Sequence, residues 1–191
     1  TGNGLDNAVA LTGGTMPSPV MTPHSLYLEA NVTIAAAATL TLSPGVSVTA
    51  RPNVALLVSG GLNAVGAAGS PVAFRPDGAT SWSGVVLMPG ASGNLAHVTF
   101  LGAGIPGAVT IAPVTNAGAA LTAYQADVSL TDAQVTGGLG DGVLLVNDST
   151  TPKTATLTRL TVTGAAKNGV NLYAAPANEA LSLSEMQISG C

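Results

Sequence analysis

The sequence has very little charge and few aromatic residues. Only 7% of its 191 residues are charged, five Lys or Arg against nine Asp or Glu, and the formal net charge is −4. Proteins that hold nucleic acid through its phosphates carry clusters of Lys and Arg. No such cluster is present, so we expect no nucleic-acid partner. Aromatic residues make up 3% of the chain, which disfavours a polysaccharide groove lined by several rings.

Long hydrophobic runs and pairs of cysteines are also missing. The longest weakly polar run, 32–42, is interrupted by threonines and is too short to span a bilayer, so we expect no transmembrane helix. The chain begins at Thr1 without a charged-then-apolar leader, which indicates a mature processed protein or an excised segment. The single cysteine, Cys191, has no internal disulfide partner. We expect it to be free, paired between molecules or simply at a segment boundary.

What is present is enough apolar material for one domain, together with a strong strand signal. Hydrophobic residues make up 47% of the chain. Short alternating runs such as "TLTL", "VSVTA" and "LTVTG" are separated by Gly, Pro, Asn and Asp, which predicts an all-β domain. In "ATLTLSPGVSVTARP" the pair Pro44 and Gly45 predicts a corner between two strands, because Pro sets φ and Gly accepts a positive φ.

Two marks recur along the second half of the chain. A leucine mark begins "LAHVTFLGAG", "LTDAQVTGG", "LTRLTVTGA" and "LSEMQISGC", and it falls at Leu95, Leu130, Leu157 and Leu183. Each follows a glycine mark, in "SGVVL", "GAVTI", "DGVLL" and "NGVNL", at Gly84, Gly107, Gly142 and Gly169. The last two copies lie 27 residues apart on the glycine and 26 on the leucine. A helix-free repeat of this length indicates one coil of a parallel β-solenoid.

In such a solenoid, inward Val, Leu and Ile side chains stack in columns from coil to coil. The predicted inward positions are Val85, Leu87, Val109, Val143, Leu145 and Val170. The interval from Gly107 to Gly142 is longer than its neighbours, so we expect "APVTNAGAALTAYQ" to leave the coil as a loop, where variation and function would sit.

Five signatures follow one another in the first half of the chain. They are Tyr27 leading an extended segment, the turn Leu40–Gly45, the corner Gly61–Gly66, the strand Pro71–Phe74 and the step Trp82–Val85. In this order, over residues 26–104, they resemble the opening coils of bacterial right-handed parallel β-helix proteins of the pectin-lyase-like superfamily. The resemblance implies a single right-handed parallel β-helix (β-solenoid) domain with irregular corner loops over residues 1–191. Residues 1–25 would be an N-terminal extension or cap, and residues 26–191 would be the stacked coils.

Enzymes of this superfamily bind calcium or cleave sugars with clustered carboxylates and nearby Arg or Lys. Here the acids are scattered, and no "N-x-D", paired "D-D", "G-H-G" or "R-x-K" pattern occurs. Beyond residue 50 they are Asp77, Asp127, Asp132, Asp141, Asp148, Glu179 and Glu185. We therefore expect no enzyme activity and assign no catalytic, cofactor-binding or metal-binding residue and no cofactor.

Three of these acids, Asp132, Asp141 and Asp148, lie close in sequence around coil corners, where folding can bring them near one another. The segment "GGLGDG", 137–142, is similar to a calcium-binding "G-G-x-G-x-D" repeat, but it is one residue short and occurs once. Such sites need adjacent copies to complete the coordination of the ion. A glycine-rich corner is the favoured interpretation.

The remaining polar candidates also have structural interpretations. His24 and His97 lack metal-ligand spacing, and His97 is expected to face solvent or a corner. Trp82 is expected to pack at a coil corner. Arg51 and Arg75, each followed by Pro, are expected to be solvated neighbours on successive coils.

A threonine series in "TPKTATLTRLTVTG" raises the possibility of an ice-binding array. The residues are Thr154, Thr156, Thr158, Thr161 and Thr163. A true array needs T-x-T pairs stacked coil after coil, and only "TLT" at Thr39 and Thr156 is repeated. Outward threonines on strands are the favoured interpretation.

The sequence therefore predicts a non-catalytic, extracellular structural or surface module that assembles end to end into filaments or acts in adhesion. The physical reason for assembly is that a parallel β-helix exposes unpaired backbone groups at both ends, and no capping helix is evident. The alternative is a polysaccharide-binding or polysaccharide-cleaving module. The expected partners are other copies of the chain and a cell-surface polysaccharide, and the expected location is secreted or on the cell surface of a bacterium.

Overall fold

The fold is known from a computed structural model that describes residues 8–18, 20–22, 24–78, 81–110, 117–174 and 179–191. These residues form nineteen strands and no helix, so the all-β prediction is confirmed for this part of the chain. It follows that no helix in these ranges is long and apolar enough to cross a membrane.

The strands form two sheets, called sheet A and sheet B, with twelve and seven strands. Sheet B contains β2 (Gly14–Met16), β5 (Val32–Ile34), β8 (Ala55–Val58), β11 (Gly84–Leu87), β13 (Ala119–Tyr124), β15 (Asp141–Asn147) and β17 (Val170–Ala174).

Sheet A consists of two strips. Strip A1 contains β3 (Val20–Thr22), β6 (Thr39–Leu42), β9 (Gly61–Val65) and β18 (Glu179–Ser184). Strip A2 contains β1 (Val9–Leu11), β4 (Leu26–Leu28), β7 (Ser47–Ala50), β10 (Val72–Pro76) and β19 (Gln187–Ser189). Three long strands run through both strips, β12 (Ser92–Leu101), β14 (Asp127–Thr136) and β16 (Lys153–Thr163).

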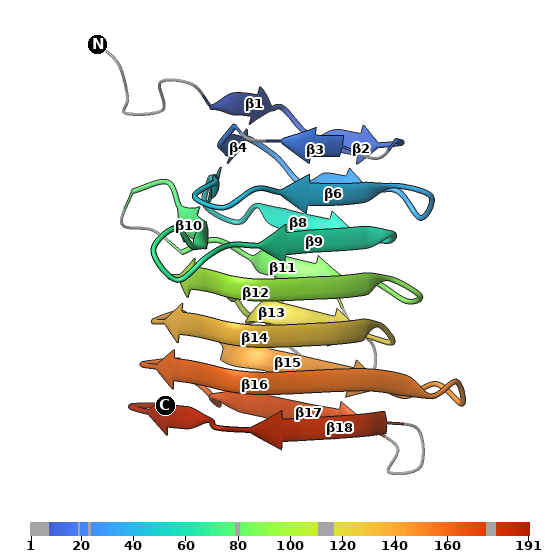
Figure 1. The fold of residues 1–191 in the computed structure, drawn as a ribbon, viewed down its shortest axis with the longest axis vertical. Coiled ribbons are helices and arrows are strands. Elements are labelled where there is room, and N and C mark those ends of the chain that lie inside the picture. Colours follow the sequence, from blue (N-terminus) through green and yellow to red (C-terminus); the bar gives the residue numbers. More distant parts are fainter. Residues whose placement is uncertain (1–7, 19, 23, 79–80, 111–116, 175–178) are drawn as a thin grey trace.

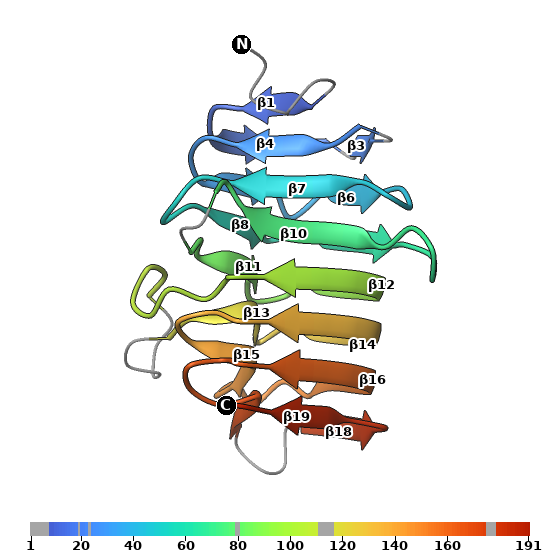
Figure 2. The same ribbon diagram turned by 90° about the vertical axis from the view of Figure 1, so that its left-hand side faces the viewer.

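The chain passes repeatedly through strip A2, sheet B and strip A1, and we call each such pass a rung. Every pair of neighbouring strands in the two sheets is parallel, for example β11 with β13 and β14 with β16. Figures 1 and 2 show the rungs stacked along the long axis of the molecule, with β1 at one end and β18 and β19 at the other. Because each rung pairs with the rungs before and after it, the fold grows in one direction.

The leucine mark of the sequence is confirmed as a structural repeat. Leu95 pairs in register with Leu130, Leu130 with Leu157, and Leu157 with Leu183. The first three of these side chains are completely buried. Of the predicted inward positions, Val85, Leu87, Val143 and Leu145 are buried in the main core, and Val170 packs against it.

Apolar columns run through the rungs between the two sheets. The longest column in strip A2 consists of Val9, Leu26, Val48, Phe74, Phe100, Val135, Val162 and Ile188, each the register partner of the next. The rings of Phe74 and Phe100 stack with their centroids 4.9 Å apart and an interplanar angle of 10°. Column stacking therefore joins residues that are 17 or more positions apart in the chain.

The glycine mark at Gly107 was predicted to begin the strand that precedes Leu130 in the repeat, and this prediction was wrong. Val109 lies in a bend outside the strands, and the strand of this rung is β13, so "AALTAY" lies in sheet B and not in a loop. Leu121 is the register partner of both Val85 and Val143. Ala120 precedes Leu121 at the position where Gly84 and Gly142 precede their valines. The glycine pattern instead matches the preceding segment, which the structure describes at residues 102–110, 117 and 118; residues 111–116, which include part of the predicted loop, lie outside the described residues.

The described part of this segment contacts the outer face of sheet B. Val109 packs against a second apolar cluster that lies outside the main core and includes Val86, Leu144 and Val146. The outer side of these strands is thus partly covered by apolar side chains, which explains why β11 and β15 are buried on both faces.

The segment predicted as an extension or cap also contributes strands. In its described part, β1, β2 and β3 pair in parallel with β4, β5 and β6 and so form the first rung. The predicted corner at Pro44 and Gly45 joins β6 to β7, and Gly45 has a φ of 81°.

Candidate functional site

Four residues with positive φ angles lie where the chain passes from strip A1 to strip A2. They are His97, Asp132, Arg159 and Glu185, with φ angles of 48°, 52°, 51° and 52°. The residues just before them belong to one register column, so the four lie on successive rungs. A positive φ is uncommon for residues with a Cβ and turns the strand locally. We call this set the corner ladder.

Side chains of the corner ladder are paired across rungs. Arg159 donates from Nε to Asp132 Oδ1 at 2.6 Å and from Nη2 to Asp132 Oδ2 at 2.8 Å. His97 Nε2 lies 3.8 Å from Asp132 Oδ2 on the other side. The side chains of His97, Asp132 and Arg159 are 35%, 27% and 46% exposed. The ladder is therefore a partly exposed row in which basic and acidic groups alternate.

The geometry accounts for two shifted pKa values. The hydrogen bonds from Arg159 lower the pKa of Asp132, and the charges of Arg159 and His97 add to this effect while desolvation opposes it. The same hydrogen bonding to Asp132 raises the pKa of Arg159, and the charges of Asp132 and Glu185 add to it. A bidentate Arg–carboxylate pair of this kind fixes the spacing of two rungs.

An open groove runs beside the corner ladder. It has a volume of ≈ 480 Å³ and lies between the turn at 67–71 and the ladder, with Thr99, Gln134 and Thr161 along its floor. Its lining combines a guanidinium, a carboxylate, an imidazole, an amide and hydroxyl groups. Such a surface can hydrogen-bond a polar ligand.

The outward positions of strip A1 form a second polar surface, which we call the polar array. Its longest column is Thr41, Asn63, Asn94, Ser129, Thr156 and Ser182, each the register partner of the next. Asn94 Nδ2 donates to Asn63 Oδ1 at 2.9 Å, and Ser184 Oγ donates to Thr158 Oγ1 at 3.2 Å in the adjacent column. The array lines a shallow groove of ≈ 310 Å³.

A pattern of stacked T-x-T pairs does not identify this array. The partners of Thr156 are Ser129 and Ser182, so a continuous polar column exists although its residue types vary. The signal that could have found it is the alternation of any short polar residue with Leu, Val or Ala in the "VSL", "TLT" and "LSLS" segments.

A third polar group lies nearer the N-terminal end. Tyr27 Oη donates to Asp77 Oδ2 at 2.5 Å, Arg51 Nε donates to Tyr27 Oη at 3.2 Å, and Arg51 Nη2 donates to Glu29 Oε1 at 3.3 Å. The Tyr27 hydrogen bond, followed by the charge of Glu29, raises the pKa of Arg51. Arg75 turns to a different partner and donates to a threonine hydroxyl of β7 at 3.2 Å. Arg51, just after β7, and Arg75 in β10 thus lie on neighbouring rungs but do not share a site.

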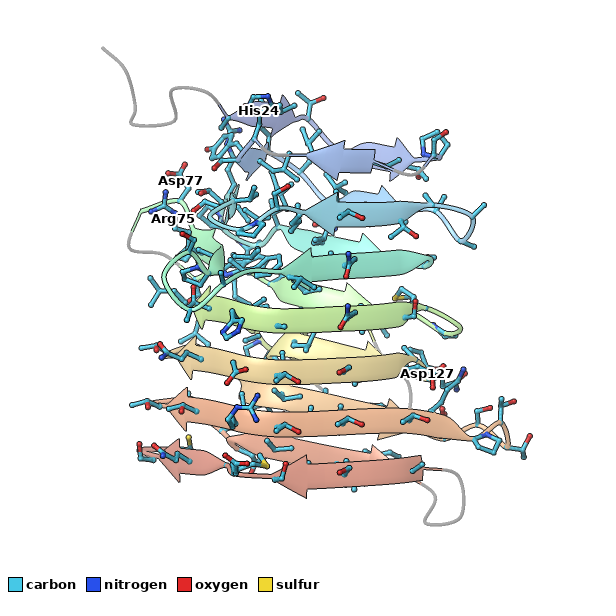
Figure 3. All side chains as sticks on the ribbon, viewed as in Figure 1. His24, Arg75, Asp77 and Asp127 are labelled. Carbon is cyan, nitrogen blue, oxygen red and sulfur yellow. The ribbon has the colours of Figure 1, made fainter. Side chains whose placement is uncertain are left out.

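Asp132, Asp141 and Asp148 are held by different partners. Asp141 is 5% exposed and accepts hydrogen bonds from Asn168 N at 3.0 Å, Asn168 Nδ2 at 2.8 Å and Asn171 Nδ2 at 3.1 Å. Gln125 donates to Asp148. In the ranges that the structure describes, no three His, Cys, Asp or Glu side chains could hold one metal ion. Figure 3 also places Asp77 and Asp127 on opposite sides of the molecule.

The "GGLGDG" segment runs from a tightly packed corner after β14 into the first two residues of β15. Gly138 has a φ of 120°, and a Cβ added at Gly140 would lie 2.0 Å from the carbonyl oxygen of Gly118. Both glycines are needed for backbone conformation or close approach.

The other predicted candidates are far from one another. Trp82 is completely buried at a corner, as predicted, and its Nε1 donates to Leu101 O at 3.1 Å. His24 is exposed in the corner between β3 and β4, at the N-terminal end of the stack (Figure 3). Cys191 is an exposed free thiol.

Comparison of the chain with protein-family models, curated proteins and solved structures gives no match.

Proposed function

We propose that the chain is a right-handed parallel β-helix of the pectin-lyase-like superfamily that serves as a non-catalytic, extracellular structural or surface module. In this role it joins other copies end to end into filaments or acts in adhesion. The fold part of the proposal is supported by the parallel pairing of every rung and by the apolar columns between the sheets.

The observation that carries the functional part is how the polar side chains are used. Within the described residues, most side-chain hydrogen bonds and ion pairs bridge neighbouring rungs, as in Arg159–Asp132, Asn168–Asp141 and Lys153–Asp127. These pairs strengthen the stack along its axis, and the carboxylates do not converge on one cavity. This use of charge fits a rigid spacer or filament subunit better than a reaction centre.

Electron microscopy and sedimentation of the purified 191-residue chain over a range of concentrations test the structural role. We expect elongated assemblies, or a monomer that adheres to intact bacterial cells. A monomer at every concentration that also fails to adhere would contradict the proposal.

Incubation with acidic polysaccharides tests the non-catalytic part. We expect no release of unsaturated or reducing sugar ends by the pure protein. Release that disappears in Asp132→Asn or Asp141→Asn would show instead that one of these carboxylates is catalytic.

A polysaccharide-binding or polysaccharide-cleaving module is the second candidate. It is favoured by the polar array and by the groove beside the corner ladder, whose amides, hydroxyls and guanidinium can hydrogen-bond sugar hydroxyls. Affinity electrophoresis with neutral and acidic polysaccharides would show retardation, and Asn94→Ala should reduce it. Equal mobility with and without polysaccharide would remove this candidate.

The proposed location is outside the cell or on the cell surface of a bacterium. The support is the family resemblance and a composition poor in Lys and Cys. Antibody labelling of intact cells and fractionation of the culture medium would check it, and a signal confined to lysed cells would contradict it.

A further inference from the structure

The corner between β16 and β17 contains an asparagine that is followed by glycine. The sequence has two such pairs, at Asn3 and at Asn168. Asn3 lies outside the described residues, whereas Asn168 is exposed in this corner. The backbone nitrogen of the residue after an asparagine can attack the side-chain carbonyl carbon and displace the amide. Glycine permits this attack best, because it has no side chain and its backbone is less restricted. The corner is therefore chemically susceptible to deamidation.

In the folded chain, the side chain of Asn168 is held by the carboxylate of Asp141. Asn168 Nδ2 donates to Asp141 Oδ1 at 2.8 Å, and the backbone N of Asn168 donates to the same oxygen at 3.0 Å. The neighbouring carbonyl groups are also fixed. Gly142 N donates to Asn168 O at 2.8 Å. Val143 N donates to Gly169 O at 2.9 Å. Asp141 is only 5% exposed, so water competes little for its oxygens.

This contact opposes deamidation in two ways. The hydrogen bonds fix the torsion angles of Asn168, so its side-chain carbonyl carbon cannot turn freely toward the nitrogen of Gly169. The negative charge beside Nδ2 also makes the carbonyl carbon less electrophilic, which slows nucleophilic attack. We infer that Asn168–Gly169 is a deamidation site of this chain and that the carboxylate of Asp141 protects it in the folded state.

The reaction needs no partner other than water. The backbone nitrogen of Gly169 bonds to Asn168 Cγ and gives up its proton. The bond between Cγ and Nδ2 breaks, ammonia leaves with that proton, and a succinimide ring remains. Water then opens the ring at either of its carbonyl groups, which produces aspartate or isoaspartate at position 168. Nothing is oxidised or reduced.

The product does not fit the folded corner. A carboxylate at position 168 replaces an amide that lies 2.8 Å from Asp141 Oδ1, and two like charges at this buried site repel each other. Isoaspartate also adds a carbon to the backbone before Gly169 and shifts the carbonyl groups that accept hydrogen bonds from β15. Deamidation therefore weakens the pairing of β15 with β17, and the contact with Asp141 delays this damage.

Storage of the purified chain at mildly alkaline pH tests the inference. Peptide mass spectrometry locates the deamidated residue, and an enzymatic methyltransferase assay measures isoaspartate. We expect slow deamidation at Asn168 in the folded wild type and fast deamidation in wild type kept unfolded in urea. In folded Asp141→Ala the rate should rise by about tenfold or more, the factor that corresponds to losing one hydrogen bond to a charged group.

The matched control is Leu145→Ala. This change destabilises the same strand, β15, through the core and leaves the contact between Asp141 and Asn168 in place. Its rate of deamidation should stay near that of the wild type, under conditions in which far-UV circular dichroism shows both variants to be folded. If Asp141→Ala does not fold, Asp141→Asn takes its place. Its neutral amide oxygen accepts more weakly than a carboxylate, so the rate should rise severalfold.

Three results would overturn the inference. The first is an unchanged rate at Asn168 in the folded Asp141 variant. The second is an equal rise in Leu145→Ala, which would assign the protection to general stability and not to the contact. The third is an absence of deamidation at Asn168 in the urea-unfolded wild type. All three are independent of filament formation and adhesion, so they leave the proposed function to its own tests.

Discussion

Replacing Asp141 with Ala tests whether a buried carboxylate holds the last rungs together. Asp141 lies at the start of β15 and accepts three hydrogen bonds from Asn168 and Asn171, which precede and belong to β17. Hydrogen bonds to a charged group contribute about 1.5–3 kcal/mol each. Asn168 is exposed and regains bonds to water when the carboxylate is removed. We therefore expect a loss of about 2–4 kcal/mol in the free energy of unfolding, well below the sum of three bonds.

Urea denaturation followed by circular dichroism measures this loss, and hydrogen exchange shows where it occurs. We expect the amides of β17 to lose protection first, because the broken contacts join β15 to that strand. Asp148→Ala is the matched control, since Asp148 is exposed and bound by one glutamine. A change below about 0.5 kcal/mol for Asp141→Ala, or an equal effect of the two variants, would refute the reasoning.

Three further predictions concern packing and charge. Leu145→Ala should destabilise the fold by about 3 kcal/mol. Leu172→Ala, at the next position of the same column, should cost less than half as much, because the Leu145 and Leu172 side chains are 1% and 47% exposed. Equal losses of unfolding free energy in urea would contradict the column assignment. Gly140→Ala should lower stability by about 2 kcal/mol or more through overpacking, since its Cβ would lie 2.0 Å from a carbonyl oxygen, and an unchanged melting temperature would count against this. Because the pKa of Asp132 is lowered in the folded state, its pair with Arg159 stabilises the fold above about pH 4, and this contribution is lost as the pH falls through the folded pKa. Arg159→Gln should therefore reduce the loss of stability measured between neutral and acid pH.

Much of the fold was predictable because the same types of residue recur at matching positions of successive rungs. The leucine mark identified positions that pair in register on successive rungs, since an inward apolar residue is required once per rung at the same place. The middle glycine mark failed because Ala120, and not a glycine, precedes Leu121 at the position where Gly84 and Gly142 precede their valines. Pattern matching to one residue type therefore misplaced β13 by half a rung.

The polar surfaces were less predictable. His97, Asp132 and Arg159 lie 27 or more residues apart and share no motif, yet register brings them into one ladder. Asp141 was considered with Asp132 and Asp148, but its hydrogen-bond partners are Asn168 and Asn171, which no spacing rule connects to it. Side-chain partners across rungs depend on exact register and on corner lengths, which vary from rung to rung.

The sequence by itself determined that the described part of the chain is all-β and that an apolar side chain recurs once per rung. It did so because strand alternation and coil length are local properties that must hold in every rung. Only the tertiary structure decided which strands share a strip, that residues 9–22 form the first rung, and that Val9 and Ile188 are the two ends of one column. These relations arise from stacking, in which residues far apart in sequence become neighbours at a spacing of about 4.8 Å.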